Sequence, residues 1–270
     1  MTSYSIRRVS SFFKKCLSCA IPGLFVCACG ATPLDQDMTR MASATAPTLT
    51  PDGMNDASMG PTVPVSPISR TGPCCGPVSA RAADVLSVID TSDVTHRWRK
   101  GEHIAWDTGL PDRSEESEAR YAQRYPKGTH CSAYVAAIGQ RLGIYMLRPP
   151  AHSQVLLASA QTAWFGSGQG RQAGWLPVAS AVNAQALANA GYLVVASYPS
   201  PDPHRPGHIG VVRADAARTV GQIDADGVLM AQAGDTNAER ISARLAFSAH
   251  HGAWPAHIQY FAHPLAVKVG

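Results

Sequence analysis

The chain has 270 residues, of which 45% are hydrophobic and 16% are charged, so most of it can form a sizeable core. Its formal net charge is +4, and the first thirty residues account for all of it because they contain Arg7, Arg8, Lys14 and Lys15 and no acidic residue. The remainder is electrically balanced, which gives no electrostatic reason to expect nucleic acid or an anionic membrane surface as a partner.

Residues 1–30 have the pattern of an export signal, with a basic start, a short apolar run and small residues at the end. The run is shorter than the roughly 20 residues that span a bilayer. The sequence V-C-A-C at 26–29 is similar to a bacterial lipobox, in which Cys29 would carry the lipid; ordinary signal-peptide cleavage nearby is the alternative. We therefore expect a protein of the periplasm or cell envelope, either lipid-anchored at Cys29 or released.

Residues 31–78 are rich in Pro, Ser, Thr, Met and Ala and show no apolar periodicity. Such a segment buries too little apolar surface to order itself, so it predicts a disordered tether. The folded domain is expected over residues 79–264.

Helical periodicity dominates the first half of this domain. A helix that begins near Thr129, as N-cap, and ends at Gly143 would place Cys131 in its first turn. Gly191 is expected to end another helix as its C′ residue. The expected helices other than that of Cys131 cover residues 82–90, 114–125, 153–165 and 180–190.

Short apolar runs bounded by Pro, Gly or Asp dominate the second half and predict strands. Helices followed by a mostly antiparallel sheet define an α+β fold class. The expected strands cover residues 192–198, 208–213, 228–232 and 256–261.

Three cysteines remain after the signal, namely Cys74, Cys75 and Cys131, an odd number for an oxidising compartment. Neighbouring Cα atoms lie about 3.8 Å apart, below the usual range for a disulfide, so a bridge between Cys74 and Cys75 would be strained. Cys131 is therefore either bridged to one of them, simply packed in the core, or an unpaired nucleophile.

Cys131 has the position that a catalytic thiol needs. The unpaired N–H groups of a helix N-terminus stabilise a thiolate and can form part of an oxyanion hole. His208 in P-G-H-I-G-V-V, at the start of a strand, is the candidate base. Gln232 on the next strand is the candidate residue to orient the imidazole, with Asp235 and Asn237 as alternatives.

The segments T-H-C-S-A-Y-V and P-G-H-I-G-V-V resemble the nucleophile helix and the histidine strand of papain-like NlpC/P60 and CHAP cysteine amidases. The resemblance covers residues 128–237. It implies a papain-like fold with Cys131 as nucleophile and His208 as general base, in a family that cleaves peptidoglycan amide bonds. The third position departs from the family, because CHAP domains commonly have Glu followed closely by Asn, and NlpC/P60 enzymes often have a second His. A neutral amide such as Gln232 can still orient imidazole.

The sequence thus predicts a cysteine-dependent amidase or endopeptidase that cleaves peptidoglycan stem peptides through a thioester. The alternatives are an inactive envelope binding module of the same fold and an antibacterial amidase toxin. No cofactor or metal is expected, because His250, His251, His257 and His263 lack a metal-binding spacing. His130 is expected on the surface. The expected partner is a peptide or peptidoglycan, and no nucleic acid is expected. Membrane contact is expected only through Cys29. The sequence does not define the oligomeric state.

Overall fold

The computed structural model describes residues 72–112 and 128–266. The expected signal with Cys29, the tether up to residue 71 and the expected helix 114–125 lie outside the described residues. Within the described ranges, no helix combines the length and the apolar character that a membrane crossing requires.

A six-stranded sheet forms the centre of the described domain, with strand order β1-β6-β2-β3-β4-β5 and antiparallel pairing throughout. Each of the four expected strands is present. The expectation missed β1, which has three residues, and β5, whose sequence N-A-E-R-I-S lacks apolar alternation. The strands are β1 (Leu176–Val178), β2 (Leu193–Tyr198), β3 (His208–Val212), β4 (Leu229–Ala233), β5 (Asn237–Ser242) and β6 (Gln259–His263).

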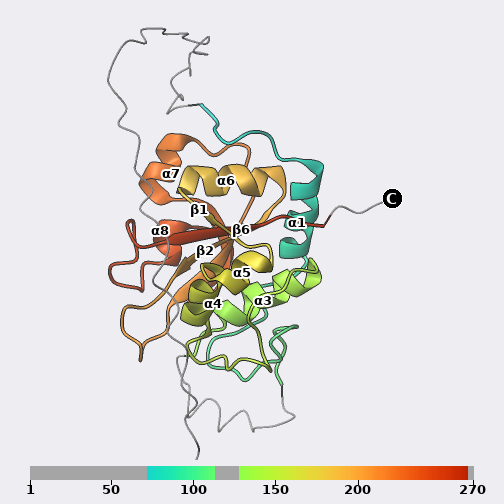
Figure 1. The fold of residues 1–270 in the computed structure, drawn as a ribbon, viewed down its shortest axis with the longest axis vertical. Coiled ribbons are helices and arrows are strands. Elements are labelled where there is room, and N and C mark those ends of the chain that lie inside the picture. Colours follow the sequence, from blue (N-terminus) through green and yellow to red (C-terminus); the bar gives the residue numbers. More distant parts are fainter. Residues whose placement is uncertain (1–71, 113–127, 267–270) are drawn as a thin grey trace, which may run out of the picture. The chain divides into compact units, whose positions relative to one another are not determined.

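Helices cover both faces of the sheet (Figure 1). Local sequence explains where several of them begin and end: Ser180 caps α6 by accepting a hydrogen bond from the Asn183 N–H, and Gly191 ends α6 with a φ of 96°. The helices are α1 (Ala80–Asp90), α3 (Cys131–Arg141), α4 (Leu157–Phe165), α5 (Gly168–Gln172), α6 (Ala181–Ala190), α7 (Val220–Asp226) and α8 (Ala243–Ala246).

Two apolar cores lie on the two faces of the sheet because successive strand residues point in opposite directions. On β3, Ile209 and Val211 belong to the core that contains α3, whereas Val212 belongs to the core that contains α6 and α8. Both central strands, β2 and β3, are buried along their whole length. Helices packed on an antiparallel sheet confirm the α+β prediction.

The domain begins before residue 79, the start that the sequence predicted. The Cys74 N–H donates to the Arg218 carbonyl at 2.8 Å, and the Asn189 side-chain amide donates to the Gly76 carbonyl at 2.9 Å. Asn189 is almost completely buried on α6. Residues 72–78, which their composition assigned to the tether, are thus held against the domain by hydrogen bonds that composition does not reveal.

Candidate active site

The cysteine pairing leaves Cys131 as a free thiol. Cys74 and Cys75 form a disulfide with each other, so the alternative in which one of them bridges to Cys131 is wrong. The Cys131 side chain is buried, with an exposed fraction of 4%. A substrate can therefore react with the sulfur only if it enters the interior beside α3.

Cys131 is the first residue of α3, as the sequence predicted, although the N-cap is His130 rather than Thr129. The backbone of Ile209, the residue that follows His208, hydrogen-bonds the thiol. The register between β3 and β4 extends only over Val211–Ala231 and Val212–Met230, so Ile209 lies beyond the paired part of the two strands. The helix N-terminus thus meets the start of β3.

The pKa of Cys131 departs from the sequence-based expectation. Burial raises the pKa of the thiol, and hydrogen bonds from Ile209, Ser132 and Thr129 oppose that rise only in part. The helix N-terminus was expected to lower this pKa, but the sulfur lies in the apolar core with α3 and Ile209, where a thiolate loses its hydration. The thiol is consequently neutral at neutral pH.

His208 and Gln232 form the best-defined contact of the site. His208 Nε2 lies 2.6 Å from Gln232 Oε1, and Gln232 Nε2 donates to the Thr236 carbonyl at 3.0 Å. A carbonyl can only accept, so this second bond fixes which end of the Gln232 amide faces the histidine. Gln232 Oε1 must then accept a hydrogen bond from the His208 Nε2–H, which places the free lone pair of the neutral imidazole on Nδ1.

The surroundings of His208 keep its imidazole neutral. The ring packs edge-on against Phe247 at 5.1 Å and stacks on His250 at 5.1 Å with an interplanar angle of 15°. Burial, followed by repulsion from His250, lowers the pKa of His208 to about 4, while Gln232 and Asp235 act in the opposite direction. The ring is therefore an unprotonated acceptor over the whole neutral range.

The structure brings Cys131 and His208 together through the backbone of β3 rather than through their side chains. Among the described residues no hydrogen bond joins the thiol to the imidazole. The ring packs on Phe247 in the core of α6 and α8, whereas Cys131 and Ile209 belong to the core of α3. The predicted contact between sulfur and imidazole stays a prediction.

The two alternative orienting residues have other partners. Asp235 forms an ion pair with Lys100 at the surface. It raises the pKa of His208 by electrostatic attraction and makes no hydrogen bond to the ring. The Asn237 side-chain amide donates to the carbonyls of Val94 at 2.8 Å and Arg97 at 2.6 Å, so it holds the loop after α1. Of the three candidates, Gln232 alone hydrogen-bonds the imidazole.

Sequence analysis did not place three residues at or beside the site, namely Phe247, His250 and His130. Phe247 and His250 follow α8 and contact His208, and no local signal in the sequence relates them to that histidine. His130 is buried, not on the surface, because Nε2 lies 2.9 Å from the Glu102 carbonyl and Nδ1 lies 3.3 Å from Gln154 Oε1. No group of three or more metal-ligating side chains occurs within residues 72–112 and 128–266.

No protein-family model matches this chain, and no curated protein matches it. The resemblance to cysteine amidases therefore depends on the two segments around Cys131 and His208.

Proposed function

We propose that this chain is a cysteine-dependent amidase or endopeptidase of papain-like fold that cleaves peptide amide bonds of cell-wall peptidoglycan. The observation that carries the proposal is the chain of hydrogen bonds His208–Gln232–Thr236, which leaves a lone pair on Nδ1. A general base needs a ring nitrogen with a free lone pair, and this hydrogen bonding supplies one. The free Cys131 thiol at the start of α3 provides the nucleophile. It is hydrogen-bonded to the backbone of Ile209, the residue next to His208.

The proposed reaction requires the His208 ring to reach the thiol, a contact that is not present in this structure. Cys131 Sγ then bonds to the carbonyl carbon of the substrate as His208 Nδ1 takes the thiol proton. Because thiol and imidazole are both neutral at the outset, attack and proton transfer occur together. The C–N bond then breaks, and the proton on Nδ1 passes to the leaving amine. Water, deprotonated by the same nitrogen, hydrolyses the thioester and regenerates the thiol.

The backbone N–H of Cys131 is the proposed oxyanion donor, since the first N–H groups of a helix have no partner within the helix. Gln232 takes the place that an Asn, Glu or second His takes in the resembling families. A neutral amide holds the imidazole without adding negative charge, in keeping with the low pKa of His208.

Substrate and location are inferred from the resemblance and the first thirty residues. An enzyme exported to the periplasm or cell envelope, with Cys29 as lipid attachment site, would reach the peptidoglycan polymer through the long Pro/Ser/Thr-rich segment before the domain.

A second candidate function is an envelope binding module without activity. Burial of the thiol, its raised pKa and the missing hydrogen bond to His208 favour this alternative. The two candidates differ in whether Cys131 is needed for bond cleavage or only for packing.

Digestion of purified peptidoglycan, with products identified by mass, separates these candidates. We expect cleavage by the wild-type chain and a loss of at least about a thousandfold with Cys131→Ala, which removes the nucleophile. Cys131→Ser keeps nearly the same shape and serves as the control for folding. Full cleavage by Cys131→Ala would end the proposal.

A further inference from the structure

Residues 72–78, which we call the strap, lie against α6 and the beginning of α7 (Figure 1). The Cys74 N–H donates to the Arg218 carbonyl at 2.8 Å, and Pro73 forms an isolated β-bridge with Thr219. Of the described residues 72–78, only Cys74 is buried, with an exposed fraction of 8%. Backbone hydrogen bonds rather than an apolar core therefore hold the strap on the domain.

The side chain of Asn189, almost completely buried near the end of α6, is the main anchor of the strap. Its amide donates to the Gly76 carbonyl at 2.9 Å and to the Cys75 carbonyl at 3.3 Å. Both residues have a left-handed backbone, with φ of 75° at Cys75 and 76° at Gly76. Glycine adopts this conformation freely, whereas in cysteine the Cβ crowds the backbone. The backbone of Cys75 therefore needs a restraint to stay in place.

The disulfide between Cys74 and Cys75 supplies that restraint. It closes a ring around the peptide bond between the two residues, which limits the conformations that the Cys75 backbone can adopt. After reduction, Cys75 can return to the extended or right-handed conformations that L residues prefer, and its carbonyl then turns away from Asn189. Attachment of the strap is thus coupled to the oxidation state of one pair of sulfur atoms.

The two sulfur atoms differ in their access to solvent. Cys74 is buried, whereas Cys75 is half-buried at the surface, so a thiolate in solution reaches Cys75 first. We propose that the Cys74–Cys75 disulfide is a site of thiol–disulfide exchange with a dithiol, such as the C-x-x-C pair of an oxidoreductase, and that its reduction releases the strap. This proposal is independent of Cys131 and of the amidase function.

In the proposed exchange, a thiolate of the dithiol attacks Cys75 Sγ and forms a mixed disulfide as the bond to Cys74 Sγ breaks. Cys74 Sγ leaves as a thiolate and takes up a proton. The second thiolate of the dithiol then attacks its own partner sulfur in the mixed disulfide, so Cys75 Sγ also leaves and is protonated. Two electrons and two protons pass to the protein, and the dithiol becomes a disulfide.

Release of the strap ends at Ser79. The Ser79 hydroxyl caps α1 by accepting a hydrogen bond from the Ala82 N–H at 3.1 Å, and the Ser79 N–H donates to the Asn189 backbone carbonyl at 2.9 Å. α1 is itself held by buried apolar residues such as Val85 and Ile89. Reduction therefore moves the point at which the preceding chain is held from Cys74 to Ser79, and an extended strap adds a reach of at most about 25 Å.

The test is amide hydrogen exchange of the full chain by NMR, before and after treatment with dithiothreitol, with iodoacetamide labelling of Cys74 and Cys75 to verify reduction. Exchange of the Cys74 N–H should accelerate by about tenfold or more, the effect of losing a restrained left-handed residue, while the Ser79 N–H keeps its protection. Unchanged protection of Cys74 in the reduced chain, or an equal loss at Ser79, would overturn release of the strap. A bond that dithiothreitol leaves intact in the folded chain would overturn the exchange site.

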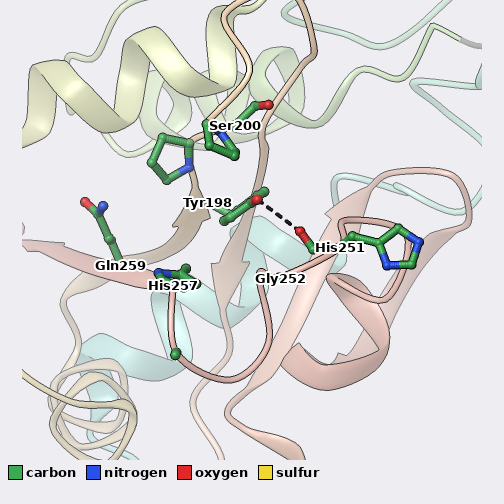
Figure 2. Close-up of a pocket in the computed structure, with 9 residues that line it drawn as sticks. Tyr198, Ser200, His251, Gly252, His257 and Gln259 are labelled. Carbon is green, nitrogen blue, oxygen red and sulfur yellow. Dashed lines mark hydrogen bonds between the residues drawn. The ribbon is translucent and has the colours of Figure 1, made fainter.

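The opposite end of β2 provides the internal control. Figure 2 shows a pocket there, in which the Tyr198 hydroxyl donates to the His251 carbonyl at 3.2 Å. The described residues that line this pocket include none of the strap's partners. Nearby, the His257 N–H donates to the Ala253 carbonyl at 3.0 Å, and its exchange should not change on reduction. Acceleration at His257 would mean that reduction loosens the whole domain, which contradicts a local release.

Two double variants separate the backbone restraint from the sulfur atoms themselves. Cys74→Ser with Cys75→Ser should exchange at residue 74 as fast as the reduced wild type. Cys74→Ser with Cys75→Gly should retain more protection, because glycine adopts the left-handed backbone without a disulfide. Equal exchange in the two variants would overturn the role assigned to the Cys75 backbone.

Discussion

Burial of a neutral His208 makes a quantitative prediction for the pH dependence of stability. Its pKa falls from about 6.5 in an unfolded chain to about 4 in the folded protein. The unfolded state therefore takes up a proton first as the pH falls. The stabilisation is complete above pH 6.5 and is lost progressively between pH 6.5 and about 4. About 2.5 pKa units correspond to about 3 kcal/mol.

The assay is urea unfolding of the full chain at pH 7.0, 5.5 and 4.0, compared with His208→Gln. Glutamine does not titrate and can still donate to Gln232, so the difference between the two pH profiles isolates His208 from His130 and His250, whose pKa values burial also lowers. We expect the wild type to lose about 3 kcal/mol more than the variant between pH 7 and 4.

Parallel stability profiles for the two proteins would refute the reasoning. If His208→Gln does not fold, NMR titration of the wild type gives the same information. The His208 Cε1–H resonance should not shift between pH 5 and 8. A titration midpoint near 6.5 would contradict the lowering of the His208 pKa by burial and by repulsion from His250.

Three further predictions concern neighbouring residues. Alkylation of Cys131 by iodoacetamide should be slow at neutral pH and still increase above pH 9, because burial raises the pKa of the thiol; rapid labelling at pH 7 would contradict that assignment. Gln232→Ala should lower kcat more than it changes KM and destabilise the chain by about 1–3 kcal/mol, because the His208 N–H and the Thr236 carbonyl lose their partner. Gln232→Asn is the matched comparison. Unchanged kcat in Gln232→Ala would exclude an orienting role. Asn237→Ala should cost a similar stability through the loop carbonyls it holds, yet leave the NMR titration of His208 unchanged; a shifted titration would mean that Asn237 does belong to the site.

The sequence predicted those elements that short-range signals define, such as capping residues and apolar runs. Ser180 and Gly191 mark the ends of α6 by capping chemistry, and the apolar runs of β2 and β3 are strands because both of their faces are covered. The polar β5 has no such signal, since its pairing with β4 depends on the neighbouring strand rather than on its own residues.

The candidate site was predictable in part. The hydrogen bond between His208 and Gln232 follows from their positions near the ends of neighbouring strands that point to one face. The pKa of Cys131 did not follow, because a helix N-terminus favours a thiolate only where the sulfur keeps some hydration, and burial depends on how α3 packs against β3. The stacking of His250 on His208 likewise depends on the tertiary placement of the segment after α8.

Trapping the acyl-enzyme tests the central claim most directly. The full chain is mixed with soluble muropeptides, quenched in acid within the first turnover, digested and analysed by mass spectrometry. The account predicts a thioester on the peptide that contains Cys131, absent in Cys131→Ala and strongly reduced in His208→Gln. Product release with no adduct on Cys131, or an adduct that forms equally fast in His208→Gln, would contradict it.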